Sequence, residues 1–106
     1  MSNYLLAYHG GGMPQTDQER ARVNAAWGQW YQQLGPAVID GGNPVGQSMM
    51  ISSDGSTKPG GGSNPVSGYT IIRADSMSDA VKLSQGCPVL ASGGSVEVGE
   101  TFEVAM

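Results

Sequence analysis

Two amphipathic stretches, each with a helix start signal and a glycine stop, constrain most strongly how this chain can fold. The first spans residues 16–34, where Thr16 is a suitable N-cap and Glu19, three residues later, completes a capping-box pattern. Apolar side chains then recur at steps of three and four residues, as on one face of a helix: Val23, Ala26, Trp27, Trp30, Tyr31 and Leu34. Gly35-Pro36 ends the pattern, so the sequence predicts one helix of several turns.

The second stretch is shorter and predicts a helix over residues 77–85. Ser76 is its N-cap, Asp79 occupies the capping-box position, and Gly86 fits the position after the last turn. Apolar or alternating segments around the two helices predict strands at 3–8, 37–39 (resuming over 45–53), 69–73 and 95–104. The order β-α-β-β-α-β predicts an α+β, ferredoxin-like fold, an antiparallel sheet with two helices on one face.

The predicted strands are apolar over longer runs than a sheet covered on one side requires. Leu5-Leu6-Ala7, Met49-Met50-Ile51 and Ile71-Ile72 are such runs. A second sheet packed on the open face would explain them, and we therefore expect a homodimer, most simply with two-fold symmetry. Residues 55–66 are rich in glycine, serine and proline, have no periodicity, and predict an exposed, mobile loop.

Charge and composition exclude several classes of function. The 106 residues suit a single domain, and the net charge of −4, with five Lys and Arg against nine Asp and Glu, gives no electrostatic footprint for nucleic acid. No run approaches the roughly 20 apolar residues of a membrane helix, so we expect a cytoplasmic protein without membrane contact. The single cysteine, Cys87, excludes an internal disulfide and is interpreted as structural. The sequence predicts no metal site and no cofactor.

Several segments together resemble the YCII-related (DGPF) family of small α+β proteins. They are Tyr4-Leu5-Leu6-Ala7-Tyr8, Gly41-Gly42 after the second strand, Cys87-Pro88 after the second helix, and Gly93-Gly94-Ser95-Val96-Glu97-Val98. The resemblance covers nearly the whole chain and implies a dimeric α+β barrel with a cleft in each protomer. It also implies acid/base chemistry on small, ring-type molecules. The Asp-Gly-Pro-Phe signature itself is replaced by Asp54-Gly55-Ser56-Thr57.

His9 is the one histidine of the chain and stands where the first strand meets Gly10-Gly11-Gly12. Its side chain titrates near neutral pH and could act as a general base or acid. Asp40 ends the second strand beside two glycines and could orient the imidazole. The alternatives are a partly solvated loop histidine, and an aspartate that caps its own turn.

Three further residues are candidates for substrate binding. Trp27 or Trp30 could form the apolar wall of a pocket between the first helix and the sheet, although their helical spacing equally suits the core. Asn43 could offer its amide to a substrate carbonyl, or could simply form a turn before Pro44. Two main functions therefore remain open: a cofactor-independent isomerase or lyase that uses His9, and a non-catalytic ligand-binding or accessory protein that kept the dimeric scaffold. A third hypothesis is a protein-interaction module that uses the loop at residues 55–66.

Overall fold

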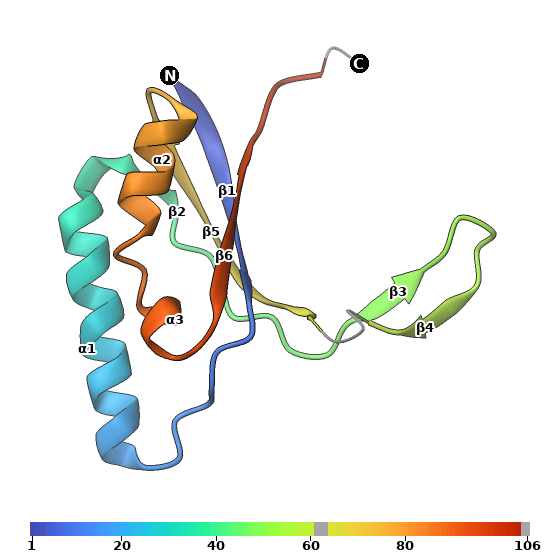
Figure 1. Ribbon diagram of the computed structural model, residues 1–106, viewed down its shortest axis with the longest axis horizontal. Helices are drawn as coiled ribbons and strands as arrows, with labels where there is room; N and C mark the ends of the chain where they lie inside the picture. The colour runs from blue at the N-terminus through green and yellow to red at the C-terminus, as the bar shows by residue number, and fades with distance from the viewer. Residues whose placement is uncertain (61–63, 105–106) are drawn as a thin grey trace.

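A computed structural model describes residues 1–60 and 64–104 of the chain. It is built around one antiparallel sheet with helices on one of its faces (Figure 1). In chain order the elements are β1 (Ser2–His9), α1 (Asp17–Leu34), a 3-10 turn (Gly35–Ala37), β2 (Val38–Asp40), β3 (Met49–Ile51), β4 (Thr57–Pro59), β5 (Val66–Ala74), α2 (Met77–Ser84), α3 (Pro88–Ala91) and β6 (Ser95–Glu100).

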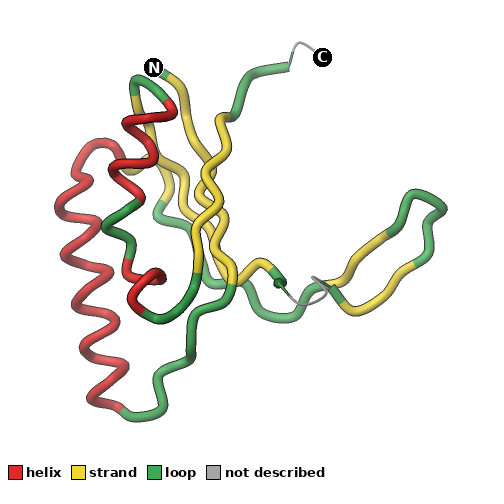
Figure 2. Tube along the Cα trace, viewed as in Figure 1, coloured by secondary structure: helices red, strands yellow, loops and turns green. Residues whose placement is uncertain are grey.

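The main sheet has the strand order β2-β5-β1-β6, and every neighbouring pair is antiparallel. The first strand of the chain is therefore central, with Leu5 paired to Ile71 of β5 on one side and to Gly99 of β6 on the other. This is the ferredoxin-like arrangement, so the predicted fold class is confirmed. β3 and β4 form a separate two-stranded hairpin, which stands away from the sheet (Figure 2).

Both helices begin at the residues that the capping patterns indicate. The Thr16 hydroxyl accepts a hydrogen bond from the backbone N–H of Glu19 at 3.0 Å, and the Ser76 hydroxyl accepts one from Asp79 at 3.1 Å. Each bond satisfies a backbone donor that the first turn of a helix leaves free. At the end of α1, Gly35 has a φ of +56° and donates its N–H to the Tyr31 carbonyl, a conformation that favours glycine.

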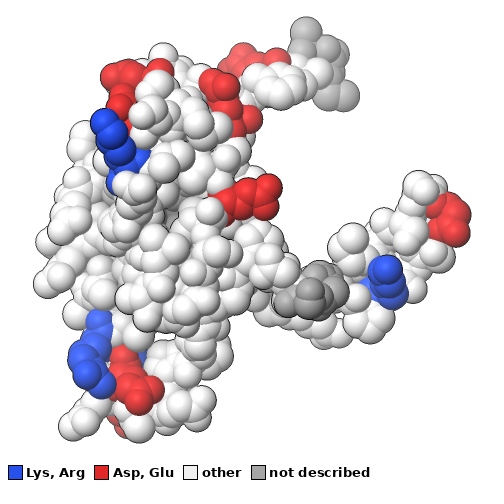
Figure 3. Space-filling view, in the orientation of Figure 1, with Lys and Arg blue, Asp and Glu red and all other residues white. Residues whose placement is uncertain are grey.

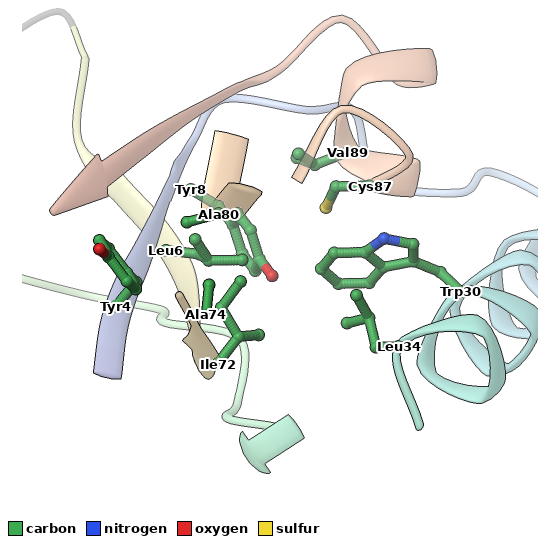
Figure 4. Packing of buried hydrophobic residues seen from close by; sticks show 10 residues of the cluster. All are labelled: Tyr4, Leu6, Tyr8, Trp30, Leu34, Ile72, Ala74, Ala80, Cys87 and Val89. Atoms are coloured by element: carbon green, nitrogen blue, oxygen red, sulfur yellow. The ribbon is translucent and has the colours of Figure 1, made fainter. Parts of the chain in front are cut away.

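The core lies between the helices and the face of the sheet that carries alternate residues of β1 and β5 (Figure 4). Its buried members are Tyr4, Leu6, Tyr8, Trp30, Leu34, Ile72, Ala74, Ala80, Cys87 and Val89. The Trp30 indole crosses between helices, where its Nε1–H donates to the Leu83 carbonyl at 3.1 Å. The aromatic side chains of α1 thus join α2 to the sheet.

The structure departs from the expected elements in two places. The segment 45–53 is not one strand of the main sheet, because only Met49–Ile51 is a strand and it pairs with β4. The expected loop 55–66 supplies β4, and its residues 61–63 lie outside the described part of the chain. The turn follows from Asp54, whose carboxylate accepts hydrogen bonds from the Ser56 N–H and hydroxyl, and from Gly55 with a φ of +87°.

The C-terminal strand is also shorter than expected. β6 ends at Glu100, and Thr101 then donates both its N–H and its hydroxyl to the Asn3 carbonyl, each at 2.9 Å. Phe102 and Val104 follow with 83% and 66% of their surface exposed. Across residues 1–60 and 64–104, no helix has the length and apolar character needed to cross a membrane.

Candidate functional site on the open face of the sheet

The face of the sheet opposite the helices carries no covering element among the described residues (Figure 1). Side chains alternate between the two faces of a strand. Since Tyr4, Leu6 and Tyr8 point into the core, the open face receives Leu5, Ala7 and His9 of β1. This face is partly apolar, because Leu5 of β1 and Ile39 of β2 expose 39% and 43% of their surface.

His9 lies at the end of β1 with both ring nitrogens engaged. Its Nδ1 is 3.1 Å from the Asn64 carbonyl oxygen, and its Nε2 is 3.4 Å from Oε1 of Glu97. A carbonyl oxygen only accepts hydrogen bonds, so the Nδ1–H must be the donor to Asn64. This fixes the ring orientation and leaves the lone pair of Nε2 on the open face, directed at Glu97. The His9 side chain is only 16% exposed in the single protomer.

Glu97 brings a carboxylate to this imidazole from the neighbouring strand. Glu97 of β6 pairs with Ala7 of β1, and Ser95 pairs with His9, so the two side chains are diagonal neighbours on one face. The contact is an ion pair when the imidazole is protonated, and the Glu97 side chain is 76% exposed. The sequence reasoning missed this residue. Its only signal was the alternation of the C-terminal strand, which predicts a face but not a partner strand.

Asp40 lies on the edge strand β2 and caps its own turn. Its Oδ1 accepts a hydrogen bond from the Gly42 N–H at 2.9 Å. Asp40 pairs with Ile71, which pairs with Leu5, so β5 separates it from β1 and His9 is four residues further along. Strand spacings of about 4.8 Å and rises of about 3.3 Å put their backbones on the order of 16 Å apart. The structure therefore does not bring His9 and Asp40 together within one protomer, and the carboxylate beside His9 is that of Glu97.

The two tryptophans lie on the other side of the sheet from His9. Trp30 is 3% exposed in the core, and Trp27 packs edge-on against Tyr8, with ring centroids 5.4 Å apart. Because Tyr8 and His9 point to opposite faces of β1, the sheet itself separates both indoles from the imidazole. Asn43 is exposed, and its backbone carbonyl accepts a hydrogen bond from the N–H of Tyr69 at 3.3 Å. The expected pocket walled by the first helix is thus not the place where His9 lies.

Hydrogen-bonded hydroxyl groups of the core connect to the Gly41-Gly42 turn. The Tyr8 hydroxyl donates to Thr70 Oγ1 at 2.6 Å, and that hydroxyl donates to the Gly41 carbonyl at 3.0 Å. The Tyr31 hydroxyl donates to the same carbonyl at 3.0 Å. Burial raises the pKa of the Tyr8 phenol far above its usual range, so this hydroxyl remains a donor at every physiological pH. The turn that carries Asp40 is thereby fixed to the core.

Elsewhere, a groove of about 470 Å³ runs between α1 and the segment joining α2 to α3. Its polar side chains come from α1 and from Ser92, and it includes neither a histidine nor a carboxylate. Within residues 1–60 and 64–104, no three His, Cys, Asp or Glu side chains are grouped so as to hold a metal ion. The groove therefore contains no side chain suited to acid/base catalysis near neutral pH.

Cys87 lies in the core at 3% exposure, and burial raises the pKa of its thiol.

The chain matches no known family model, and no curated protein sequence matches it. Among solved structures it is similar to the 5-chloro-2-hydroxyhydroquinone dehydrochlorinase TftG from Burkholderia phenoliruptrix AC1100, in complex with 2,5-dihydroxybenzoquinone. The TM-score is 0.53 at 16% sequence identity, and the alignment covers 95% of each chain. At this identity the likeness shows the fold, and it extends over nearly the whole of both chains.

Proposed function

We propose that this protein is a YCII-related homodimer that acts on a small, partly apolar ring compound by proton transfer, as an isomerase or lyase without a cofactor. The single observation that carries the proposal is the placement of His9 on the open face of the sheet. There its Nδ1–H is committed to a backbone carbonyl, and its Nε2 faces the Glu97 carboxylate. The likeness to a dehydrochlorinase that binds a dihydroxybenzoquinone supports the fold and the class of molecule.

The chemistry requires one group that takes up a proton and a neighbour that stabilises the resulting charge. Nε2 of His9 is the proton acceptor, and the Glu97 carboxylate stabilises the imidazolium that forms. In an elimination from the keto tautomer of a hydroxylated ring, the base removes a proton from the carbon next to the one that bears the leaving group. The C–H electron pair forms the new double bond, and the leaving group departs with its own bonding pair. The imidazolium then releases the proton to water or, in an isomerisation, returns it to another atom of the ring. Asp40 and Asn43, on β2 and the segment after it, are proposed as rim positions of this face.

A second protomer would supply the cover that the His9 site lacks in a single chain. The Glu97 side chain is 76% exposed, and apolar Leu5 and Ile39 also face solvent. Electrostatic and acid/base effects are much weaker in open water than in an enclosed site. A second copy of the chain packed on the open face would bury these apolar side chains and enclose the imidazole. The homodimer is therefore part of the proposed function rather than an addition to it.

The test uses the chemistry of the structural neighbour as its probe. We expect 2,5-dihydroxybenzoquinone to bind the intact protein with a saturable change in its visible absorbance, and to shift the ring resonances of His9. Chloride release from 5-chloro-2-hydroxyhydroquinone measures turnover. His9→Gln should lower turnover by about 10² to 10⁴-fold. The control that should leave turnover unchanged is Asp75→Asn, an exposed carboxylate after β5 at the end of the sheet opposite His9.

Two results would contradict the catalytic proposal. Turnover that survives His9→Gln would remove the histidine from the mechanism. Saturable binding with no turnover of this or related ring compounds would favour the non-catalytic ligand-binding protein, in which His9 and Glu97 recognise a hydroxyl group.

A further inference from the structure

The β3–β4 hairpin, here called the arm (residues 48–60), projects from the body of the molecule (Figure 1). Its base is closed by a hydrogen bond from the Gly60 N–H to the Ser48 carbonyl at 2.9 Å, and its tip by one from the Ser52 N–H to the Ser56 carbonyl at 2.8 Å. The projection makes the protomer extended. Its radius of gyration is 15.2 Å, against about 13 Å for a compact chain of this length.

The arm lacks a core of its own and exposes apolar side chains. All six residues of β3 and β4 are exposed, and the three of β3, Met49, Met50 and Ile51, leave 54%, 46% and 70% of their surface uncovered. An isolated two-stranded hairpin is at best marginally stable in water, and it needs packing against another element. Exposed apolar side chains on a protruding element mark a contact surface. Within residues 1–60 and 64–104, the body of the same protomer does not provide that contact.

The uncovered face of the main sheet has the matching properties. It carries the exposed apolar side chains of Leu5 and Ile39. Glu97 of β6 places a carboxylate on this face, whereas the arm carries Lys58 in β4 and Asp54 in its tip turn (Figure 3). Met50 and Lys58, which pair across the arm, thus complement an apolar face that carries a carboxylate.

We propose that the arm of each protomer reaches across the two-fold axis and covers the open sheet face of a second copy of this chain, so that each His9 site is completed by the arm of the other copy. Both complementary parts are on every chain, and two-fold symmetry pairs each arm with one face and leaves neither unpaired. This inference rests on the dimer of the proposed function and not on catalysis. Methionines are flexible and polarisable, so β3 forms an adaptable apolar lid over a flat ring.

A charge placed on the arm distinguishes an arm that is docked on a second copy from one that is free in solvent. Met50→Asp should convert the dimer, about twice the 10.9 kDa of one chain, into a monomer in sedimentation equilibrium at micromolar concentration. Met77→Asp is the matched control, since Met77 is similarly exposed at 43% but begins α2 on the other side of the sheet, where an acidic residue suits the helix start. A Met50→Asp protein that remains dimeric would overturn the proposal.

Mixed dimers decide whether the arm acts on its own protomer or on the other one. The armless variant replaces residues 49–59 by Asn-Gly, which the hydrogen bond between Ser48 and Gly60 makes sterically simple. It is mixed with His9→Gln, which keeps its arm but has no histidine. Every histidine resonance in the mixture then comes from the armless chain, because His9 is the only histidine.

We expect the His9 ring resonances of the armless chain to move to their intact positions when His9→Gln is added, since the arm then comes from the other copy. Resonances that remain at the positions of the armless protein would show that the arm works in its own protomer, and would overturn the proposal. Should the armless chain fail to fold, Met50→Asp takes its place. Its His9 ring resonances must then differ from those of the intact protein, and resonances at the same positions in both proteins would overturn the proposal. These readouts need no turnover, so a failure of the catalytic proposal leaves them interpretable.

Discussion

Replacing Thr70 by valine tests whether the chain of hydroxyl groups beneath the Gly41-Gly42 turn holds the fold together. Thr70 is fully buried, and valine has the same shape without the hydroxyl. The substitution removes the acceptor of the Tyr8 hydroxyl and one donor to the Gly41 carbonyl. That carbonyl keeps the Tyr31 hydroxyl, but the Tyr8 hydroxyl is left in the core beside Cys87, whose thiol is a weak partner.

The magnitudes follow from which groups lose their partners. A buried polar group without a partner costs about 1–3 kcal/mol, whereas a hydrogen bond removed with its donor costs about 0.5–1.5 kcal/mol. We therefore expect Thr70→Val to lower the free energy of unfolding by about 2 kcal/mol and Tyr8→Phe by about 1 kcal/mol. The double variant should lose about 2 kcal/mol instead of the additive 3, because no hydroxyl is then left without a partner.

Urea unfolding measures these differences in the free energy of unfolding. All variants are compared at one protein concentration, because dimer formation would add a concentration-dependent contribution to the apparent stability. The loss for Thr70→Val corresponds to a fall of about 10 °C in melting temperature for a domain of this size. A loss below about 0.5 kcal/mol for Thr70→Val, or strict additivity in the double variant, would refute the reasoning that the Tyr8 hydroxyl depends on Thr70.

Three further outcomes are expected. Gly42→Ala should lower the free energy of unfolding by at least about 2 kcal/mol in urea melts, because a Cβ at this positive φ would overlap the Tyr69 carbonyl oxygen; a neutral effect would contradict the close approach. Trp30→Phe should cost about 1–3 kcal/mol in the same assay, since the Leu83 carbonyl loses its indole donor, and a cost near zero would argue against that bond. Cys87, buried and with a raised pKa, should react with a thiol reagent only after unfolding. Its contribution to stability is complete below the unfolded thiol pKa of about 8.5 and declines as the pH rises from there toward the folded value; rapid labelling of the native protein at pH 7 would contradict this.

Local signals in the sequence determined the helices and the order of the main strands. Thr16 and Ser76 cap where their hydroxyls predict, because a capping interaction involves residues three apart and is readable in sequence. The hairpin was missed, although Asp54-Gly55 between two short segments is a hairpin signal. Three-residue strands with every side chain exposed carry no periodicity that could outweigh the turn-like composition of residues 55–60.

The candidate site was only partly readable for a different reason. His9 stands out by its residue type, but its neighbour depends on which strand lies beside β1. The sequence suggested Asp40 because it ends a strand near glycines, whereas the strand order places β6, and with it Glu97, next to His9. Trp27 and Trp30 were candidates for the same pocket, and only the alternation of β1 assigns them and His9 to opposite faces. Partners across a sheet are set by tertiary pairing, which no local pattern encodes.

The central position of β1 has a kinetic consequence. β1 is formed from residues at the start of the sequence, yet both strands that flank it, β5 and β6, come from its second half. During synthesis the α1 segment emerges long before the sheet can assemble around β1. Until β5 and β6 have been synthesised, β1 is unpaired and the side chains of Tyr4, Leu6 and Tyr8 are not covered by a sheet. Pairings over such long separations close slowly, since the loop entropy is lost before contacts compensate for it. Folding of this chain therefore depends on its last strand, and a nascent chain without β6 is the species most exposed to aggregation.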